Sequence, residues 1–249
     1  MNFLPRIVGH RGAPHLAPEN TLASFRAAAA AGIKAVEFDV ALTFDGRPVI
    51  IHDSSLERTT TGTGLLSEST LESVSGLDAG SWFDPTFSGE VVPTLEEAID
   101  LINSLGLNAN IELKPDPGRE VETAQIALSV ASECWPSDKQ PPVVTSFSRV
   151  ALAAAKEAIP EWPRGLCFEL LPEDWTDAID SLGAIIACPN SDRMTSDQAA
   201  SMVASDLEVM AWTVNDVDQA SKLIQWGVSS LCTDIPQELI PALVKRGLV

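Results

Sequence analysis

The chain has 249 residues, 45% of them apolar, which is enough to enclose a large core in one α/β domain or in two small ones. A formal net charge of -19 opposes binding to nucleic-acid backbones and anionic membranes. No stretch approaches the roughly 18 uninterrupted apolar residues of a membrane span, and polar residues 9–11 come too early for a secretory signal.

The four cysteines are widely spaced and form no C-x-x-C pair. They are Cys134, Cys167, Cys188 and Cys232, and three of them lie in apolar, strand-like runs. This pattern favours buried, reduced thiols over disulfides or zinc ligands. We therefore expect a cytoplasmic protein without stable membrane association, and the sequence leaves its oligomeric state open.

Apolar, β-branched runs alternate with helical patterns along most of the chain. The predicted strands are Arg6 to Gly9, Ala35 to Val40, Ala109 to Leu113, Val143 to Phe147, Gly165 to Glu169, Ala184 to Cys188, Glu208 to Val214 and Ser229 to Thr233. The predicted helices are Thr21 to Ala31, Thr94 to Leu105, Arg119 to Glu133, Arg149 to Ala158, Asp174 to Ser181, Ser196 to Ala204, Val217 to Trp226 and Pro236 to Lys245. Eight such units predict one (β/α)8 TIM-barrel domain over residues 1–249.

A ninth apolar run, Pro48 to Ile51, interrupts this alternation. Only seven residues separate it from the second strand, too few for a parallel crossover, and Asp45-Gly46 is a hairpin turn signal. We therefore expect an antiparallel hairpin in which paired positions sum to 91, so that Asp39 lies opposite His52. Residues 54–93 then form a small inserted cap near the barrel mouth, packed around Trp82, Phe83 and Phe87.

Three carboxylates are placed to converge at strand ends. Glu37 and Asp39 alternate along the second strand and share a face, while Glu112 ends the next barrel strand. Grouped closely, they need a compensating charge, and oxygen ligands select a hard ion such as Mg²⁺ or Ca²⁺. From spacing alone, solvated or salt-bridged acids remain an open alternative.

His10 and His52 each follow an apolar strand. Two imidazoles facing one substrate can take a proton from a nucleophile and return one to a leaving group. The residues alone leave open a pair of hydrogen-bonded structural histidines. Arg11 and Lys114 are the nearest cations in sequence and can bind phosphate oxygens, or they can merely neutralise neighbouring acids such as Glu19.

Other residues near these clusters have weaker signals. Asn20 or Thr21 is suited to cap the first helix, and Glu19 can hold Arg11 in place. Phe147 and Trp212 end later strands, where they can line the barrel mouth or serve as ordinary core aromatics.

Together these motifs resemble the glycerophosphodiester phosphodiesterase family, in particular its short cytosolic bacterial members. The family pattern appears as GHRGAPHLAPENT, VEFDVALTFDGRPVIIHD and IELKP, and the order of LERTTTGTG, LDAGSWF, PTLEEAI, VVTSF, AWTVN and GVSSLCTDIP is also similar. The segment GVSSLCTD lacks an acidic residue that many relatives have. The resemblance covers nearly the whole chain.

The resemblance implies a (β/α)8 barrel that cleaves small glycerophosphodiesters, such as glycerophosphocholine or glycerophosphoethanolamine, to glycerol 3-phosphate and an alcohol. His10 and His52 would be the acid and base. Glu37, Asp39 and Glu112 would hold one divalent metal, with the cations Arg11 and Lys114 on the phosphate. The sequence does not decide which histidine is the base.

Two alternatives remain at this stage. One is a lysophospholipase D or sphingomyelinase D type activity on the same scaffold, which requires an apolar groove at the barrel mouth. The other is a non-catalytic phosphate-binding protein, which has no need of His10 and His52.

Overall fold

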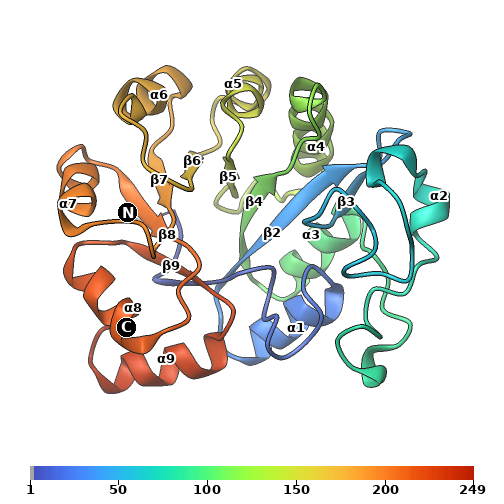
Figure 1. Ribbon diagram of the computed structural model, residues 1–249, viewed down its shortest axis with the longest axis horizontal. Coiled ribbons are helices and arrows are strands. Elements are labelled where there is room, and N and C mark those ends of the chain that lie inside the picture. Colours follow the sequence, from blue (N-terminus) through green and yellow to red (C-terminus); the bar gives the residue numbers. More distant parts are fainter. Residues whose placement is uncertain (1–2) are drawn as a thin grey trace.

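The structure is a computed structural model that describes residues 3–249, and it contains a closed barrel of eight parallel strands surrounded by helices (Figure 1). The barrel strands are β1 (Ile7–Gly9), β2 (Ala35–Leu42), β4 (Asn108–Leu113), β5 (Val143–Ser146), β6 (Arg164–Phe168), β7 (Ile186–Pro189), β8 (Glu208–Ala211) and β9 (Ser230–Thr233). They follow chain order around the barrel, and pairing of Gly9 with Val36 closes the circle. The predicted TIM barrel is confirmed.

Seven helices connect these strands and an eighth follows the last one, each within two residues of its predicted limits. They are α1 (Leu22–Ala30), α3 (Leu95–Ser104), α4 (Glu120–Cys134), α5 (Arg149–Ala158), α6 (Trp175–Leu182), α7 (Ser196–Ala204), α8 (Val217–Gln225) and α9 (Pro236–Lys245). Within residues 3–249 no helix combines the length and apolar character needed to cross a membrane.

The core has two layers because most strand residues are buried on both faces. The larger layer fills the space between strands and helices. The smaller layer, which includes Val8, Val143, Ile186 and Met210, fills the inside of the barrel. This packed interior closes the lower part of the barrel and leaves the carboxyl ends of the strands to build a site.

The antiparallel hairpin forms, but its predicted register is wrong by one residue. β3 (Pro48–Ile50) pairs outside the barrel with β2, and Val40 lies opposite Ile50, so paired positions sum to 90. The loop has three residues, 44–46, with Gly46 at φ 72°, instead of the two-residue Asp45-Gly46 turn. The extra residue places Ile51, rather than His52, opposite Asp39, and the amide of Ile51 donates to the Asp39 carbonyl oxygen at 3.1 Å.

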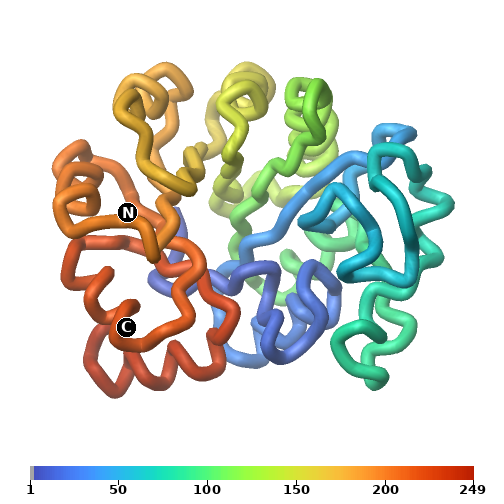
Figure 2. Tube along the Cα trace, viewed as in Figure 1, coloured from blue at the N-terminus to red at the C-terminus, as the bar shows by residue number. Residues whose placement is uncertain are grey.

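The segment 54–93, hereafter the inserted segment, runs beside the loop between β1 and α1 (Figure 2). Its short helical turns were not predicted; they are η1 (Leu66–Glu68), α2 (Leu71–Val74) and η2 (Pro85–Phe87). The segment packs Leu56, Leu66 and Val74 against the hairpin. The expected aromatic cluster also forms, with ring centroids 5.9 Å apart for Trp82 and Phe83 and 5.6 Å apart for Phe83 and Phe87.

The loop after β1 is fastened to the start of α1. The buried Ser24 hydroxyl accepts from the amide of Ala13 at 2.8 Å and donates to the carbonyl of Arg11 at 2.9 Å. Between these two contacts lies Gly12, with φ 93°, where an added Cβ would approach Ser24 Oγ to 2.3 Å. A close approach of backbone and side chain therefore fixes the loop that follows His10.

We expect Gly12→Ala to destabilise the fold by roughly 2 to 5 kcal/mol, since it adds a steric clash to an unfavourable positive φ. Gly32→Ala is the matched control. Gly32 has φ 91° with nothing within 4 Å of an added Cβ, so it should lose only about 1 to 2 kcal/mol. Urea unfolding of both variants measures the difference, and equal losses would contradict the proposed crowding at Ser24.

Candidate active site

Three carboxylates meet at the carboxyl ends of β2 and β4. Glu37 and Asp39 lie on the same face of β2, and Asp39 is paired in register with Glu112 of β4. One oxygen from each lies within 4.8 Å of the others. Glu37 and Asp39 are 3% and 1% exposed, so water provides little screening.

Burial raises the pKa of Glu37 well above its ordinary value, and the charges of Asp39 and Glu112 raise it further. Burial and the charge of Asp39 also raise the pKa of Glu112. Burial opposes ionisation of Asp39 as well, but Arg11 and the other nearby cations outweigh it and lower the pKa of that carboxyl. The three groups therefore need additional positive charge before all can be ionised.

These carboxylates fit one hard divalent cation such as Mg²⁺ or Ca²⁺. Two oxygens on opposite sides of a Ca²⁺ ion lie roughly 4.6 to 5.2 Å apart, which accommodates the observed spacing. Glu37 Oε1 is buried without a hydrogen-bond partner among residues 3–249, which leaves its lone pairs available to a ligand. The donor set is entirely oxygen, as these ions prefer.

Two cations flank the carboxylates. Arg11 Nε lies 3.1 Å from Asp39 Oδ2, and Lys114 Nζ lies 3.1 Å from Glu112 Oε1 and 3.9 Å from Asp39 Oδ1. Asn20, at φ 56°, donates its side-chain amide to Asp39 Oδ2 at 2.8 Å. The first helix is instead capped by Thr21, whose hydroxyl accepts from the amide of residue 24. Asn20 thus orients a carboxylate rather than capping the helix.

Each of the two histidines is oriented by an aspartate at its Nδ1 atom. His10 Nδ1 lies 2.6 Å from Asp234 Oδ1, and His52 Nδ1 lies 2.6 Å from Asp53 Oδ1. A carboxylate at Nδ1 fixes the proton there and leaves Nε2 as the basic nitrogen of a neutral ring. Asn215 Nδ2 in turn donates to Asp234 Oδ2 at 2.6 Å.

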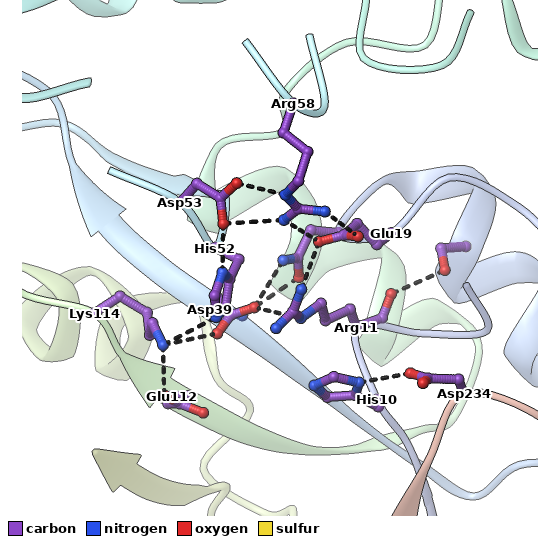
Figure 3. Close-up of polar contacts among 12 residues, drawn as sticks. His10, Arg11, Glu19, Asp39, His52, Asp53, Arg58, Glu112, Lys114 and Asp234 are labelled. Atoms are coloured by element: carbon purple, nitrogen blue, oxygen red, sulfur yellow. Dashed lines mark hydrogen bonds and ion pairs between the residues drawn. The ribbon is translucent and has the colours of Figure 1, made fainter. Parts of the chain in front are cut away.

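Arg58 links the histidine on one side of the site, His52, with the arginine on the other, Arg11 (Figure 3). The guanidinium of Arg58, from the inserted segment, donates to both oxygens of Asp53 and to both oxygens of Glu19. Glu19 also accepts from Arg11 Nη1 at 2.7 Å, as the sequence predicted. One chain of charge-assisted hydrogen bonds therefore connects His52 with Arg11.

Two adjoining cavities open at this end of the barrel. The inner cavity, of about 190 Å³, is lined by His10, Arg11, Glu37, His52, Asn110, Glu112, Lys114, Phe147, Cys167, Met210, Trp212, Thr213 and Cys232. The outer cavity, of about 660 Å³, lies between the hairpin, the loop after β4 and the end of β5. The two share His52, Glu112, Lys114 and Phe147.

The structure brings all the predicted site residues together. Eight of them line the inner cavity, and Asp39 lies beside them in contact with Arg11 and Lys114. Phe147 and Trp212 pack edge to face with centroids 5.3 Å apart.

Sequence reasoning missed the residues that support these groups. The available signals were that Asp53 directly follows His52 and that Asp234 directly follows the last strand. Arg58 and Asn215 had no comparable signal.

Comparisons with known proteins agree with this geometry. The sequence profile of the glycerophosphoryl diester phosphodiesterase family matches residues 10–238. A glycerophosphodiester phosphodiesterase of Caldanaerobacter subterraneus is 32% identical, with 97% of this chain and 98% of the relative covered. One from Bacillus subtilis is 31% identical over 92% of this chain and 83% of the relative.

A solved structure extends the similarity to three dimensions. An Oleispira antarctica phosphodiesterase, in complex with the product sn-glycerol 3-phosphate, superposes with a TM-score of 0.94 and 39% identity, covering 97% of this chain and 98% of that one. The family match, the near full-length relatives and this superposition lead to one conclusion: the chain belongs to the glycerophosphoryl diester phosphodiesterase family.

Proposed function

We propose that the chain, acting as a single catalytic domain, hydrolyses glycerophosphodiesters to sn-glycerol 3-phosphate and an alcohol, using a divalent cation and the two histidines. Membership of this family makes it a phosphoric diester hydrolase. The observation that carries the finer proposal is the meeting of both imidazoles and the three carboxylates around the inner cavity. The product in the Oleispira relative supports a small phosphodiester as the substrate class.

Glu37, Asp39 and Glu112 are the residues that would hold the cation, which when bound supplies Lewis-acid polarisation of a phosphoryl oxygen. Arg11 and Lys114 add fixed positive charge on the same cavity wall. Their charges offset the electrostatic repulsion between an anionic substrate and a chain of net charge -19.

The two cavities support different roles for the histidines. His10 lines only the inner cavity, whereas His52 borders both. We assign the glycerol phosphate half to the inner cavity and the departing alcohol to the outer one. His10 enters the reaction neutral and His52 as an imidazolium. His10 Nε2 then accepts the proton of the neighbouring glycerol hydroxyl, whose oxygen attacks phosphorus, and His52 donates its Nε2 proton to the alcohol oxygen as the bond from that oxygen to phosphorus breaks.

The product of this first step is a cyclic phosphodiester. Water then opens the ring with the histidines in exchanged roles, so that each returns to its starting protonation state. Attack by a tethered hydroxyl has a high effective molarity, which lowers the barrier without any external nucleophile.

The lining of the outer cavity favours small polar alcohols over lipid chains. Besides the four residues that it shares with the inner cavity, it is lined by polar residues alongside apolar ones; the polar residues are Asp53, Ser54, Ser55, Asp116, Ser146 and Ser148, and the apolar residues are Ala41, Leu66, Leu113, Pro115 and Pro117. A lysophospholipase D or sphingomyelinase D activity would need a continuous apolar groove there. The aspartate on each histidine argues against a purely phosphate-binding protein, because binding alone requires no oriented proton donor.

Asp116 gives the outer cavity a preference for alcohols that carry an ammonium group. Its carboxylate forms no hydrogen bond or ion pair within residues 3–249, and burial raises its pKa. A cationic alcohol such as ethanolamine or choline would stabilise the ionised form. The four cysteines form no disulfide among residues 3–249, which supports a cytoplasmic location for this activity.

Metal removal should abolish glycerol 3-phosphate release, and readdition of Mg²⁺ or Ca²⁺ should restore it. The ion also binds only the folded state, so at about 100 times its Kd it should raise the unfolding midpoint by roughly 5 °C or more. Glu112→Gln should lose this shift, whereas Glu133→Gln, an exposed residue of α4, should keep it. Calorimetry that finds the same midpoint with ion and with chelator would contradict the metal assignment.

His10→Ala and His52→Ala should each lower kcat by about 10² to 10⁴, the usual contribution of a general acid or base. His15→Ala is the control, because His15 is exposed in the loop after β1 and should leave kcat unchanged. The assay is glycerol 3-phosphate release from glycerophosphoethanolamine.

The ethanolamine phosphodiester of 1-propanol, followed by ethanolamine release beside glycerophosphoethanolamine, tests the tethered attack, since it carries no hydroxyl that can attack phosphorus. Its turnover should be at most marginal. Turnover equal to that of the glycerol diester would exclude the cyclic intermediate and leave direct attack by water.

Asp116→Asn should lower kcat/KM for glycerophosphoethanolamine by roughly 2- to 5-fold, the usual strength of a solvent-accessible ion pair, and leave neutral glycerophosphoglycerol unchanged. Asp138→Asn removes the same charge from an exposed site before β5, at the opposite end of the barrel, and should change neither value. Equal effects of Asp116→Asn on both substrates would refute the preference for ammonium alcohols.

A further inference from the structure

The carboxylates that orient the two histidines are held by different kinds of partner. Asp234, behind His10, accepts from the neutral side-chain amide of Asn215 at 2.6 Å. Asp53, behind His52, accepts from Arg58 Nε at 2.5 Å and from Nη2 at 3.0 Å. The first arrangement uses residues that follow β8 and β9, whereas the second depends on the inserted segment.

The opposite edge of the Arg58 guanidinium is also engaged. Its Nη1 and Nη2 donate to Glu19 Oε2 and Oε1 at 2.8 and 2.9 Å, and Glu19 holds Arg11 Nη1. The carboxylates of Asp53 and Glu19 thus each accept two hydrogen bonds from the planar guanidinium of Arg58 (Figure 3). Such paired geometry restricts orientation more strongly than a single contact to a lysine ammonium would.

The backbone near Arg58 is itself anchored. Leu56 is 3% exposed and packs in the core that joins the inserted segment to the hairpin. Thr60 is also buried, and its amide and hydroxyl both donate to the Leu56 carbonyl, at 3.1 and 2.6 Å. The side chain of Arg58 is 44% exposed, but it extends from a fixed turn.

We propose that Arg58 is a positioning residue for catalysis, acting through Asp53 on His52 and through Glu19 on Arg11. The inference rests on the proposed function, in which His52 protonates the leaving alcohol and Arg11 binds the phosphate. It makes the inserted segment a working part of the active site. The groups facing His52 are Asp53 from its own loop, Asp39 from β2, Arg11 from the loop after β1 and Lys114 from the end of β4.

Arg58 acts through two arms, its contacts with Asp53 and its contacts with Glu19, and these have separable effects on the reaction. Displacement of Arg11 weakens phosphate binding, which raises KM for every substrate alike. Displacement of His52 impairs proton donation, which matters only when the leaving oxygen is basic. A p-nitrophenolate ion leaves without a proton, whereas an ethanolamine alkoxide does not. The ratio of the two rates therefore reports on the arm through Asp53.

The test compares glycerophosphoethanolamine with the p-nitrophenyl ester of glycerol 3-phosphate. We expect Arg58→Gln to lower kcat on the ethanolamine diester by roughly 10- to 100-fold, a fraction of a general acid's full contribution, and on the nitrophenyl diester by less than about threefold. Asp53→Asn should show the same leaving-group dependence. Arg58→Lys should recover part of the loss, because it restores the charge but not the fork.

Arg47→Gln is the matched control, since Arg47 is an exposed hairpin arginine with one 3.4 Å contact to Glu96. It should leave both rates unchanged. Equal losses of Arg58→Gln on the two diesters, or full kcat on both, would overturn the inference. Failure of the proposed function would look different, because the wild-type enzyme would then release no glycerol 3-phosphate from either diester.

Discussion

Three acidic side chains within 4.8 Å of one another are the constraint around which this end of the barrel is arranged. Their mutual repulsion and burial would keep at least one of them protonated in the absence of cations. Arg11 and Lys114, each 3.1 Å from a carboxylate oxygen, offset part of that repulsion, and the positive charge still lacking is what a divalent ion could supply. In the proposed reaction an anionic phosphodiester enters the same electric field, so the charges that would hold the ion and those that would hold the substrate have to be balanced together.

The balance between the carboxylates and the nearby cations depends on how the side chains are oriented as well as on their charges. Asn20 holds Asp39 from a left-handed backbone conformation, and Ser24 fastens the backbone that carries Arg11. Each contact restricts a side chain or loop that would otherwise adopt several conformations. Gly12 directly follows Arg11, and an added Cβ there would approach Ser24 Oγ to 2.3 Å. The placement of a charged side chain in the site therefore relies on close packing of the backbone beside it.

The sequence predicted the barrel and the principal site residues because both follow from local patterns. Strand and helix periodicity is local, and residues at the ends of parallel strands meet at one face regardless of their distance in the chain. The hairpin register was missed because Asp45-Gly46 is compatible with loops of two and three residues, and Gly46 adopts the left-handed conformation in either. Arg58 was missed because its partners Glu19 and Asp53 are brought together only by the tertiary fold.

The two histidines consequently belong to different parts of the molecule. His10 and its supports come from the barrel itself, through Asp234 after β9 and Asn215 after β8. His52 follows the hairpin and is supported from the inserted segment, beside the larger cavity. If the glycerol phosphate half is bound by the barrel side, changes in the inserted segment that leave Arg58 in place can alter the alcohol side without disturbing the three carboxylates. The inserted segment is then where selectivity among alcohols can vary, while the barrel keeps the chemistry of phosphorus constant.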